Sequence, residues 1–331
     1  MPEFLKGGYV LKERYIIRSI IGSGGMGSIY LAEDNRLSGR LCAVKQVQPD
    51  TTLPEKTRDQ SRDQFYREAS VLARLDHPNL PKVSDYFSEQ EADYLVMDYV
   101  PGEDLKSLMI QARRKGNFIP IGDIIAWSQQ ILDALEYLHN QDPPVIHRDI
   151  KPGNIKLTPS NLVKLVDFGL VKQMLPDEMT VTVIQGRGTA LYTPLEQYGG
   201  DTGHTDPRSD IYALGATLYH LTTNRPPLEA KSRFLKPELL ISPSEYNSDI
   251  PPRLEDSILW SLALHPSDRP QDITQLRDAL LSGTQYAGTG RPTRPTGRKL
   301  LLDEFPATQF DKVLLGLTGS LLLIGFIASF L

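Results

Sequence analysis

The sequence predicts an α+β protein of two lobes, followed by one apolar helix at its C-terminal end. The first hundred residues contain short apolar or alternating runs separated by turns, at 13–21, 28–34, 40–47 and 93–100. Such runs indicate strands. From about residue 103 onward helical patterns dominate, for example at 124–139 and 209–223. The last segment, 313–331, contains no charged side chain. Strands first and helices afterwards are typical of an α+β architecture.

The composition limits the classes of protein to which the chain can belong. Its 331 residues leave room for about two domains. The net charge of −5 and the isoelectric point of 5.7 argue against a broadly basic surface, so no nucleic-acid partner is expected. The single cysteine, Cys42, excludes an intrachain disulfide and indicates a reducing, cytoplasmic setting for the folded part. No apolar run of signal-peptide length opens the sequence.

The C-terminal end differs in composition from the rest. Residues 1–282 form the expected folded body, and 283–312 are expected to be a linker because their first part is rich in Gly, Pro, Thr and basic residues. As a helix, 313–331 would measure about 28 Å, close to the ~30 Å hydrocarbon core of a bilayer. A buried C-terminal helix is the alternative, but such helices usually keep a polar stripe. The basic linker before the apolar run predicts a single-pass cell-membrane protein with its body in the cytoplasm.

A glycine-rich stretch follows the first predicted strand. It has the spacing G-x-G-x-x-G at Gly22, Gly24 and Gly27, which lets a backbone approach phosphates closely. A dinucleotide-binding turn, a phosphate lid and an ordinary flexible loop are the three alternatives. A dinucleotide site needs a helix after the glycines, whereas two predicted strands, 28–34 and 41–47, follow here. The glycines therefore lie in a hairpin, which favours a phosphate lid.

Two charged residues occupy faces that are otherwise apolar. Lys45 shares one face of its predicted strand with apolar residues, and Glu68 lies on the apolar stripe of a predicted helix at 60–75. A buried charge is costly unless it is paired, so an ion pair between Lys45 and Glu68 is expected. The alternative is an edge lysine whose ammonium group reaches water.

The segment 145–170 is the densest in polar residues suited to chemistry. Two short strands, 155–157 and 162–166, are joined by the turn sequence TPSN and predict a hairpin. In an antiparallel hairpin Asn154 and Asp167 converge, and their oxygens suit a hard cation such as Mg²⁺ that also binds phosphate. Asp149 and Lys151 stand just upstream in the same loop. A lone aspartate is often only a cap or turn residue, but a cluster of this kind favours a site.

These motifs resemble those of the eukaryotic-like protein kinases. They are GSGGMG at 22–27, AVK at 43–45, HRDIKPGN at 147–154, DFG at 167–169, and a degenerate APE motif in TPLEQ at 193–197. The resemblance covers about residues 15–281 and implies a bilobal kinase fold, with an N-lobe at about 1–98 and a C-lobe at about 101–282. The GGMG form of the loop and the C-terminal apolar segment are similar to those of bacterial membrane-anchored serine/threonine kinases.

The resemblance implies a role for each matching residue. Asp149 would orient the attacking hydroxyl and accept its proton, and Lys151 would steady the transferring phosphoryl group. Asn154 and Asp167 would bind Mg²⁺, with Mn²⁺ as the alternative ion. Lys45 would hold the α- and β-phosphates and pair with Glu68. The full expected ATP-binding set is Ile21, Gly22, Ser23, Gly24, Gly25, Met26, Gly27, Ser28, Ile29, Lys45, Glu68, Asp98 and Val100.

The same resemblance implies specificity and regulation. Lys151 and Thr189 are features of the serine/threonine branch. Arg148 precedes the catalytic aspartate, an arrangement in which an arginine can pair with a phosphorylated activation loop. Thr180 and Thr182 are the expected acceptors, by autophosphorylation; the alternative is that they are ordinary loop residues.

Three further matches are structural. Glu196 is expected to pair with Arg269, and Asp210 to brace the catalytic loop. His147 is expected to support this loop from the core rather than to act as a base. The sequence departs from the family pattern where Pro194 and Leu195 precede Glu196.

The expected function is therefore that of a serine/threonine protein kinase in signal transduction, which uses ATP and Mg²⁺ to phosphorylate protein substrates. A pseudokinase scaffold at the membrane and a small-molecule phosphotransferase of related fold are the alternatives. A scaffold would not need Lys45, Glu68, Asp149, Asn154 and Asp167 together. A homodimer formed through the N-lobe is expected from the resemblance alone.

Overall fold

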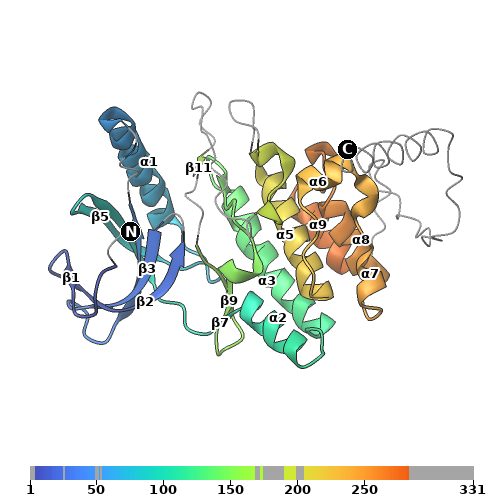
Figure 1. Cartoon of the computed structure of the whole chain (residues 1–331), viewed down its shortest axis with the longest axis horizontal. Helices are drawn as coiled ribbons and strands as arrows, with labels where there is room; N and C mark the ends of the chain where they lie inside the picture. Colours follow the sequence, from blue (N-terminus) through green and yellow to red (C-terminus); the bar gives the residue numbers. More distant parts are fainter. Residues whose placement is uncertain are drawn as a thin grey trace, which may run out of the picture. The chain divides into compact units, whose positions relative to one another are not determined.

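The computed structural model describes residues 4–24, 27–48, 52, 54–167, 172–173, 190–198 and 205–282. All of them belong to one compact unit within Met1–Arg294. Figure 1 shows a strand-rich N-terminal part, coloured blue, and a helical part, coloured green to orange. The predicted order, strands first and helices afterwards, is confirmed for the described residues.

The N-lobe is built on one antiparallel six-stranded sheet. Its strand order is β1-β2-β3-β4-β6-β5. Both faces of the sheet are covered, so β4 is buried along Cys42–Gln46 on alternate sides. The strands are β1 (Val10–Leu11), β2 (Tyr15–Gly24), β3 (Gly27–Asp34), β4 (Leu41–Val47), β5 (Val83–Glu89) and β6 (Ala92–Asp98).

Helix α1 (Glu55–Arg74) packs against the inner face of this sheet (Figure 1). Its buried residues are Phe65, Glu68, Ala69 and Leu72, which are the predicted stripe. The helix begins five residues before the predicted start at residue 60, because its first turns are polar and carry no apolar pattern.

The outer face of the sheet is covered by the N-terminal segment. Leu11, Tyr15 and Cys42 belong to a separate apolar cluster there. Burial raises the pKa of the Cys42 thiol to about 11, so it stays protonated at neutral pH. Arg14 clamps this corner by binding Asp34 with two nitrogens, at 2.8 and 2.7 Å. The N-terminal residues are therefore part of the folded lobe.

The C-lobe is built around α5 (Pro207–Thr223). Asp206 caps the helix by accepting from the backbone N–H of Arg208 at 2.8 Å. Apart from His220, every residue from Ser209 to Thr223 is buried, as a central helix requires. A Cβ on Gly215 would lie 2.5 Å from Cβ of Ser261, so glycine is needed for the close approach of α8. The other helices are α2 (Leu105–Arg114), α3 (Ile121–His139), α6 (Ala230–Leu235), α7 (Pro243–Tyr246), α8 (Pro252–Ser261) and α9 (Ile273–Arg277).

Short strands and single helical turns carry the loops of interest. The strands are β7 (Glu103–Asp104), β8 (Val145–Ile146), β9 (Ile155–Leu157), β10 (Val163–Leu165) and β11 (Lys172–Gln173). Single helical turns lie at η1 (Pro152–Asn154), η2 (Leu195–Gln197), η3 (Pro237–Leu239), η4 (Pro266–Asp268) and η5 (Asp278–Ser282). Strands β9 and β10 pair antiparallel with Ile155 opposite Leu165, which confirms the predicted hairpin.

The expected membrane segment lies outside the described residues, as does the whole of the expected linker, 283–312. Within the part of the chain that the structure describes, no helix has the length and apolar character needed to cross a membrane.

Candidate active site

A buried carboxylate holds the loop that follows β8. Oδ2 of Asp210, on α5, accepts the backbone N–H of His147, and Oδ1 accepts that of Arg148, both at 2.8 Å. Nε2 of His139, the last residue of α3, lies 2.9 Å from Oδ2. Arg148 adopts a left-handed φ of 69°, a strained conformation for a residue with a side chain. The predicted bracing of the loop by Asp210 is confirmed.

The charge of Asp210 is maintained despite complete burial. Burial alone would raise its pKa, but the hydrogen bond and charge of His139, together with His147, lower it instead. Asp210 is therefore an ionised acceptor that fixes two successive backbone amides. The contact from His139 was not predicted, because nothing in the sequence links the end of α3 to α5.

Three side chains predicted to act in catalysis meet at the loop. Lys151 Nζ lies 2.9 and 2.7 Å from the two carboxylate oxygens of Asp149. Asn154 Nδ2 donates to Oδ2 of Asp149 at 2.8 Å and to its backbone oxygen at 2.9 Å. The carboxylate of Asp149 is thus oriented by two neighbours within five residues of sequence.

The hairpin brings the end of β10 to this cluster. The backbone N–H of Val166 donates to the oxygen of Asn154 at 2.8 Å, so Asn154 and Asp167 converge as predicted. Because Nδ2 of Asn154 donates to Asp149, the remaining polar atom of its amide is an oxygen, the type of donor that Mg²⁺ prefers.

Asp167 carries a negative charge at this point. Burial opposes ionisation, but the charge and hydrogen bond of Lys45, followed by the charges of Lys151 and His147, lower the pKa of Asp167. An ionised carboxylate next to an amide oxygen fits a magnesium ion that completes its shell with phosphate and water. Among the described residues, no group of three or more His, Cys, Asp or Glu side chains could hold a metal by itself.

Lys45 lies in the interior of β4, and its side chain forms an ion pair with Asp167. Glu68 is buried on α1 and accepts from Nε2 of Gln64 at 2.7 Å. The sequence pointed to both residues through their positions on apolar faces, and both are buried. The ion pair of Lys45 with Asp167 was not expected from those positions, and the pairing of Lys45 with Glu68 stays a prediction.

The glycine-rich stretch forms the tip of the β2–β3 hairpin, as predicted. Gly22 lies opposite Ile29, Ser23 opposite Ser28, and Gly24 opposite Gly27. Gly27 has a φ of 135°, and a Cβ there would lie 1.8 Å from the backbone oxygen of Gln46. Only glycine therefore fits at that position. Gly25 and Met26 lie outside the described residues.

The remaining expected ATP-binding residues lie in β2 and at the end of β6. Ile21 is in β2, Asp98 ends β6, and Val100 follows it as a buried residue. The backbone N–H of Asp98 donates to the oxygen of Lys82 at 2.9 Å, which fixes the end of β6. Their contact with adenine stays a prediction.

Arg148 lies half-buried at the start of the catalytic loop. Burial lowers the pKa of its guanidinium to about 10, opposed by the charges of Asp210 and Glu68. Its Nε is buried, and no described residue accepts a hydrogen bond from it. Thr180, Thr182 and Thr189 lie outside the described residues, so their expected roles stay predictions.

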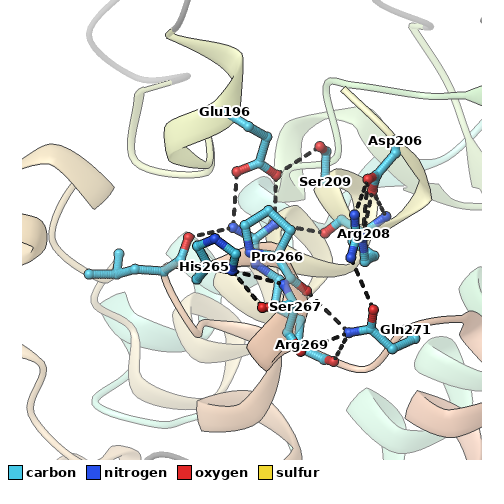
Figure 2. Close-up of polar contacts among 10 residues, drawn as sticks. Glu196, Asp206, Arg208, Ser209, His265, Pro266, Ser267, Arg269 and Gln271 are labelled. Carbon is cyan, nitrogen blue, oxygen red and sulfur yellow. Dashed lines mark hydrogen bonds and ion pairs between the residues drawn. The ribbon is translucent and has the colours of Figure 1, made fainter. Parts of the chain in front are cut away.

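The end of the activation segment is locked to the C-lobe by an ion pair, drawn in Figure 2. Arg269 binds the two carboxylate oxygens of Glu196 with separate nitrogens, at 2.6 and 3.0 Å. Its other donors reach the backbone oxygens of Ala263, Leu264 and Arg208. The predicted pair is confirmed, and it forms even though Pro194 and Leu195 depart from the family pattern.

Another contact of this segment was not predicted. The hydroxyl of Tyr192 lies 2.6 Å from Nδ1 of His220, near the end of α5. A sequence pattern carries no signal for a pair separated by 28 positions.

Comparisons with known proteins agree with this geometry. A probable serine/threonine-protein kinase of Streptomyces coelicolor is 35% identical over 291 residues, covering 83% of this chain and 41% of that protein. The serine/threonine-protein kinase PknB of Mycolicibacterium smegmatis is 34% identical, covering 82% of this chain and 43% of that protein. The chain thus spans about two fifths of the length of these relatives.

Solved structures and a family model lead to the same assignment. The structure titled PpkA-294 apo form matches 84% of this chain with a TM-score of 0.66 and 28% identity, covering 99% of that chain. The PknI kinase domain of Mycobacterium tuberculosis matches 84% of this chain with a TM-score of 0.65 and 28% identity, covering 98% of that chain. The model of the protein kinase domain matches residues 15–280. On these grounds the chain belongs to the protein kinase domain family.

Proposed function

We propose that this chain is an active serine/threonine protein kinase that transfers the γ-phosphoryl group of ATP to hydroxyls of protein substrates. The observation that carries the proposal is the joint placement of Asp149, Lys151 and Asn154 beside Asp167 and Lys45. These groups supply the positioning and charge neutralisation on which phosphoryl transfer depends. The names of the relatives, serine/threonine-protein kinases, support the acceptor class.

The chain's own residues would divide the work as follows. Asp149, held in orientation by Lys151 and Asn154, would align the acceptor hydroxyl and take its proton. Lys151 would then offset negative charge at the phosphoryl group in transfer, and Lys45 would hold the non-transferred phosphates. Asn154 and Asp167 would hold Mg²⁺, or Mn²⁺ in its place. A bound ion of this kind neutralises charge on the β- and γ-phosphate oxygens.

Transfer of labelled phosphate tests this proposal. The full chain is incubated with labelled ATP and Mg²⁺, with and without a generic protein substrate, and the labelled residues are identified. We expect phosphoserine and phosphothreonine. If ATP binds but no label is transferred, the pseudokinase scaffold is correct; if only small alcohols are labelled, the small-molecule phosphotransferase is.

We further propose that the kinase is membrane-anchored through 313–331, with 283–312 as a cytoplasmic linker. The apolar length, the basic residues before it and the GGMG form of the loop support this. The full chain should sediment with membranes and resist extraction by salt, whereas 1–282 should remain in the supernatant. Extraction by salt alone would argue against a spanning helix.

Regulation by autophosphorylation belongs to the same proposal. The buried Nε of Arg148, which no described residue accepts from, supports this, because a guanidinium could bind the phosphate of a modified Thr180 or Thr182. Changing both threonines to alanine should slow transfer, and an unchanged rate would remove them from the mechanism. A homodimer through the N-lobe, the other expectation, is tested by the mass of the full chain in detergent.

A further inference from the structure

A basic stripe on α2 runs beside the catalytic loop. Lys106 and Arg113 are exposed and seven positions apart, so they share one face of the helix. A Cβ on Gly153 would lie 3.9 Å from Cδ of Lys106. Gly153 lies between Lys151 and Asn154 in the sequence. One end of the stripe therefore contacts the loop that carries the proposed proton acceptor.

The positive charges of the stripe also affect the pKa of His220, a residue of α5. Burial lowers the pKa of His220 to about 4, and the positive charges of Arg113 and Lys106 add to this effect. The imidazole is thus neutral at physiological pH, so that Nδ1 can accept from the hydroxyl of Tyr192 at 2.6 Å. Tyr192 belongs to the segment 190–198, at the end of the activation segment. The stripe therefore contacts the catalytic loop and acts on the residue of α5 that contacts this segment.

The charged residues of α2 and of the loop after it have one sign. Between residues 105 and 122 the sequence contains Lys106, Arg113, Arg114 and Lys115 and no acidic residue. Among the described residues, both charged side chains that shift the pKa of His220 are positive. Because the imidazole of His220 is neutral, it carries no charge that would attract or repel an anionic substrate. A peptide whose hydroxyl reaches Asp149 must pass close to Gly153, and so within reach of Lys106.

We propose that Lys106 and Arg113 select protein substrates whose acceptor hydroxyl stands in a segment rich in Asp and Glu. This inference rests on the proposed kinase function and names the substrate class for that site. Opposite charges that meet across such a surface favour the correct partner, and like charges disfavour the wrong one. Exposed pairs are individually weak, so the selectivity arises from two cations acting together.

Three matched peptides test the proposal with the full chain. Each has one threonine flanked on both sides by three positions, filled with Asp, with the isosteric Asn, or with Lys. We expect kcat/KM for the Asp peptide to exceed that for the Asn peptide by about tenfold at low salt, from about two weak ion pairs. The Lys peptide should be the poorest. The preference should fall when salt is raised, because the charges are exposed.

Charge reversal assigns the preference to the stripe. In the double variant Lys106→Glu/Arg113→Glu the ratio of Asp to Asn peptide should fall to one or below, and the Lys peptide should become the best. Arg114→Glu is the matched control, because it makes the same change of charge one position away, on another face of α2. It should keep the wild-type ratio. The single variants Lys106→Gln and Arg113→Gln should each lower the ratio by about threefold. If the double variant fails to fold, these two variants still test the proposal.

The outcomes separate this inference from the proposed function. Equal kcat/KM for the Asp and Asn peptides in the wild type, or an unchanged ratio in both the double and the single variants, would overturn the inference while leaving an active kinase. Absence of transfer to every peptide and to the chain itself would instead overturn the proposed function, and the inference with it.

Discussion

Asp210 accepts the backbone N–H of His147 at 2.8 Å from a position with no solvent exposure. The same carboxylate accepts from Arg148, so one side chain of the central helix fixes the start of the catalytic loop. This relationship ties the stability of the C-lobe to the geometry of the proposed active site.

Removing this acceptor should damage both properties. Asp210→Ala leaves two buried amides without their acceptor, and we expect the free energy of unfolding to fall by about 3 kcal/mol or more. Chemical denaturation measures this. Asp206→Ala is the control, since that aspartate caps the same helix and should cost only about 1 kcal/mol. Equal losses would show that Asp210 is no more than another cap.

The ion pair between Arg269 and Glu196 should also be costly to break. Glu196→Ala leaves the guanidinium of Arg269, a fully buried side chain, without its counter-charge. We expect a loss of about 3–5 kcal/mol in the free energy of unfolding.

The exposed pair of Arg277 with Asp133 provides the comparison for this ion pair. Asp133→Ala should cost less than about 1 kcal/mol because solvent screens that pair. A loss for Glu196→Ala as small as the one for Asp133→Ala would contradict the account.

The glycine loop offers a steric test. Gly27→Ala places a Cβ against the backbone of Gln46, so the hairpin tip must shift, and kcat/KM for ATP should fall at least about tenfold. Gly39 also has a positive φ, of 82°, but a Cβ in Gly39→Ala meets no atom within 4 Å. It should change kcat/KM for ATP by less than about twofold, because it adds strain far from the tip. Steady-state kinetics at varied ATP separates the two, and equal effects would exclude the proposed phosphate lid.

The stability of the chain should depend on pH through His220. Its pKa is about 4 in the folded state against an ordinary value of 6.5, so the unfolded chain binds more protons between these values. The free energy of unfolding should therefore rise with pH from about 4 to about 6.5, by at most about 1.4 kcal/mol per pH unit from this group.

His220→Gln should flatten this dependence. Urea denaturation of the wild type and the variant at several pH values measures this. A His220→Gln variant with the wild-type slope would place the titration elsewhere.

Much of the site could be predicted from the sequence because its chemistry is local. Asp149, Lys151 and Asn154 lie within one loop, and the hairpin turn at 158–161 carries Asp167 back to them. The buried face of α1 could be predicted because its four residues recur at helical spacing in the sequence. These patterns depend on residues that are close in sequence, and the folded structure agrees with them.

Other features depend on contacts that no pattern encodes. Strand β1 has two residues and β5 follows no clear alternation, so neither was predicted. Both faces of β4 are buried. The alternation that singled out Lys45 concerned one face of the strand and gave no information about the other. The contacts of His139 with Asp210 and of Tyr192 with His220 join distant segments, and they arise only when the helices pack.

The most direct test of the account is the rate of phosphoryl transfer by Asp149→Asn. We expect kcat to fall by about 10²–10⁴-fold, the range for loss of a positioned proton acceptor, while the affinity for Mg·ATP stays near that of the wild type. Asp123→Asn, an exposed aspartate at the start of α3, should retain wild-type activity. Transfer by Asp149→Asn at the wild-type rate would contradict the central claim.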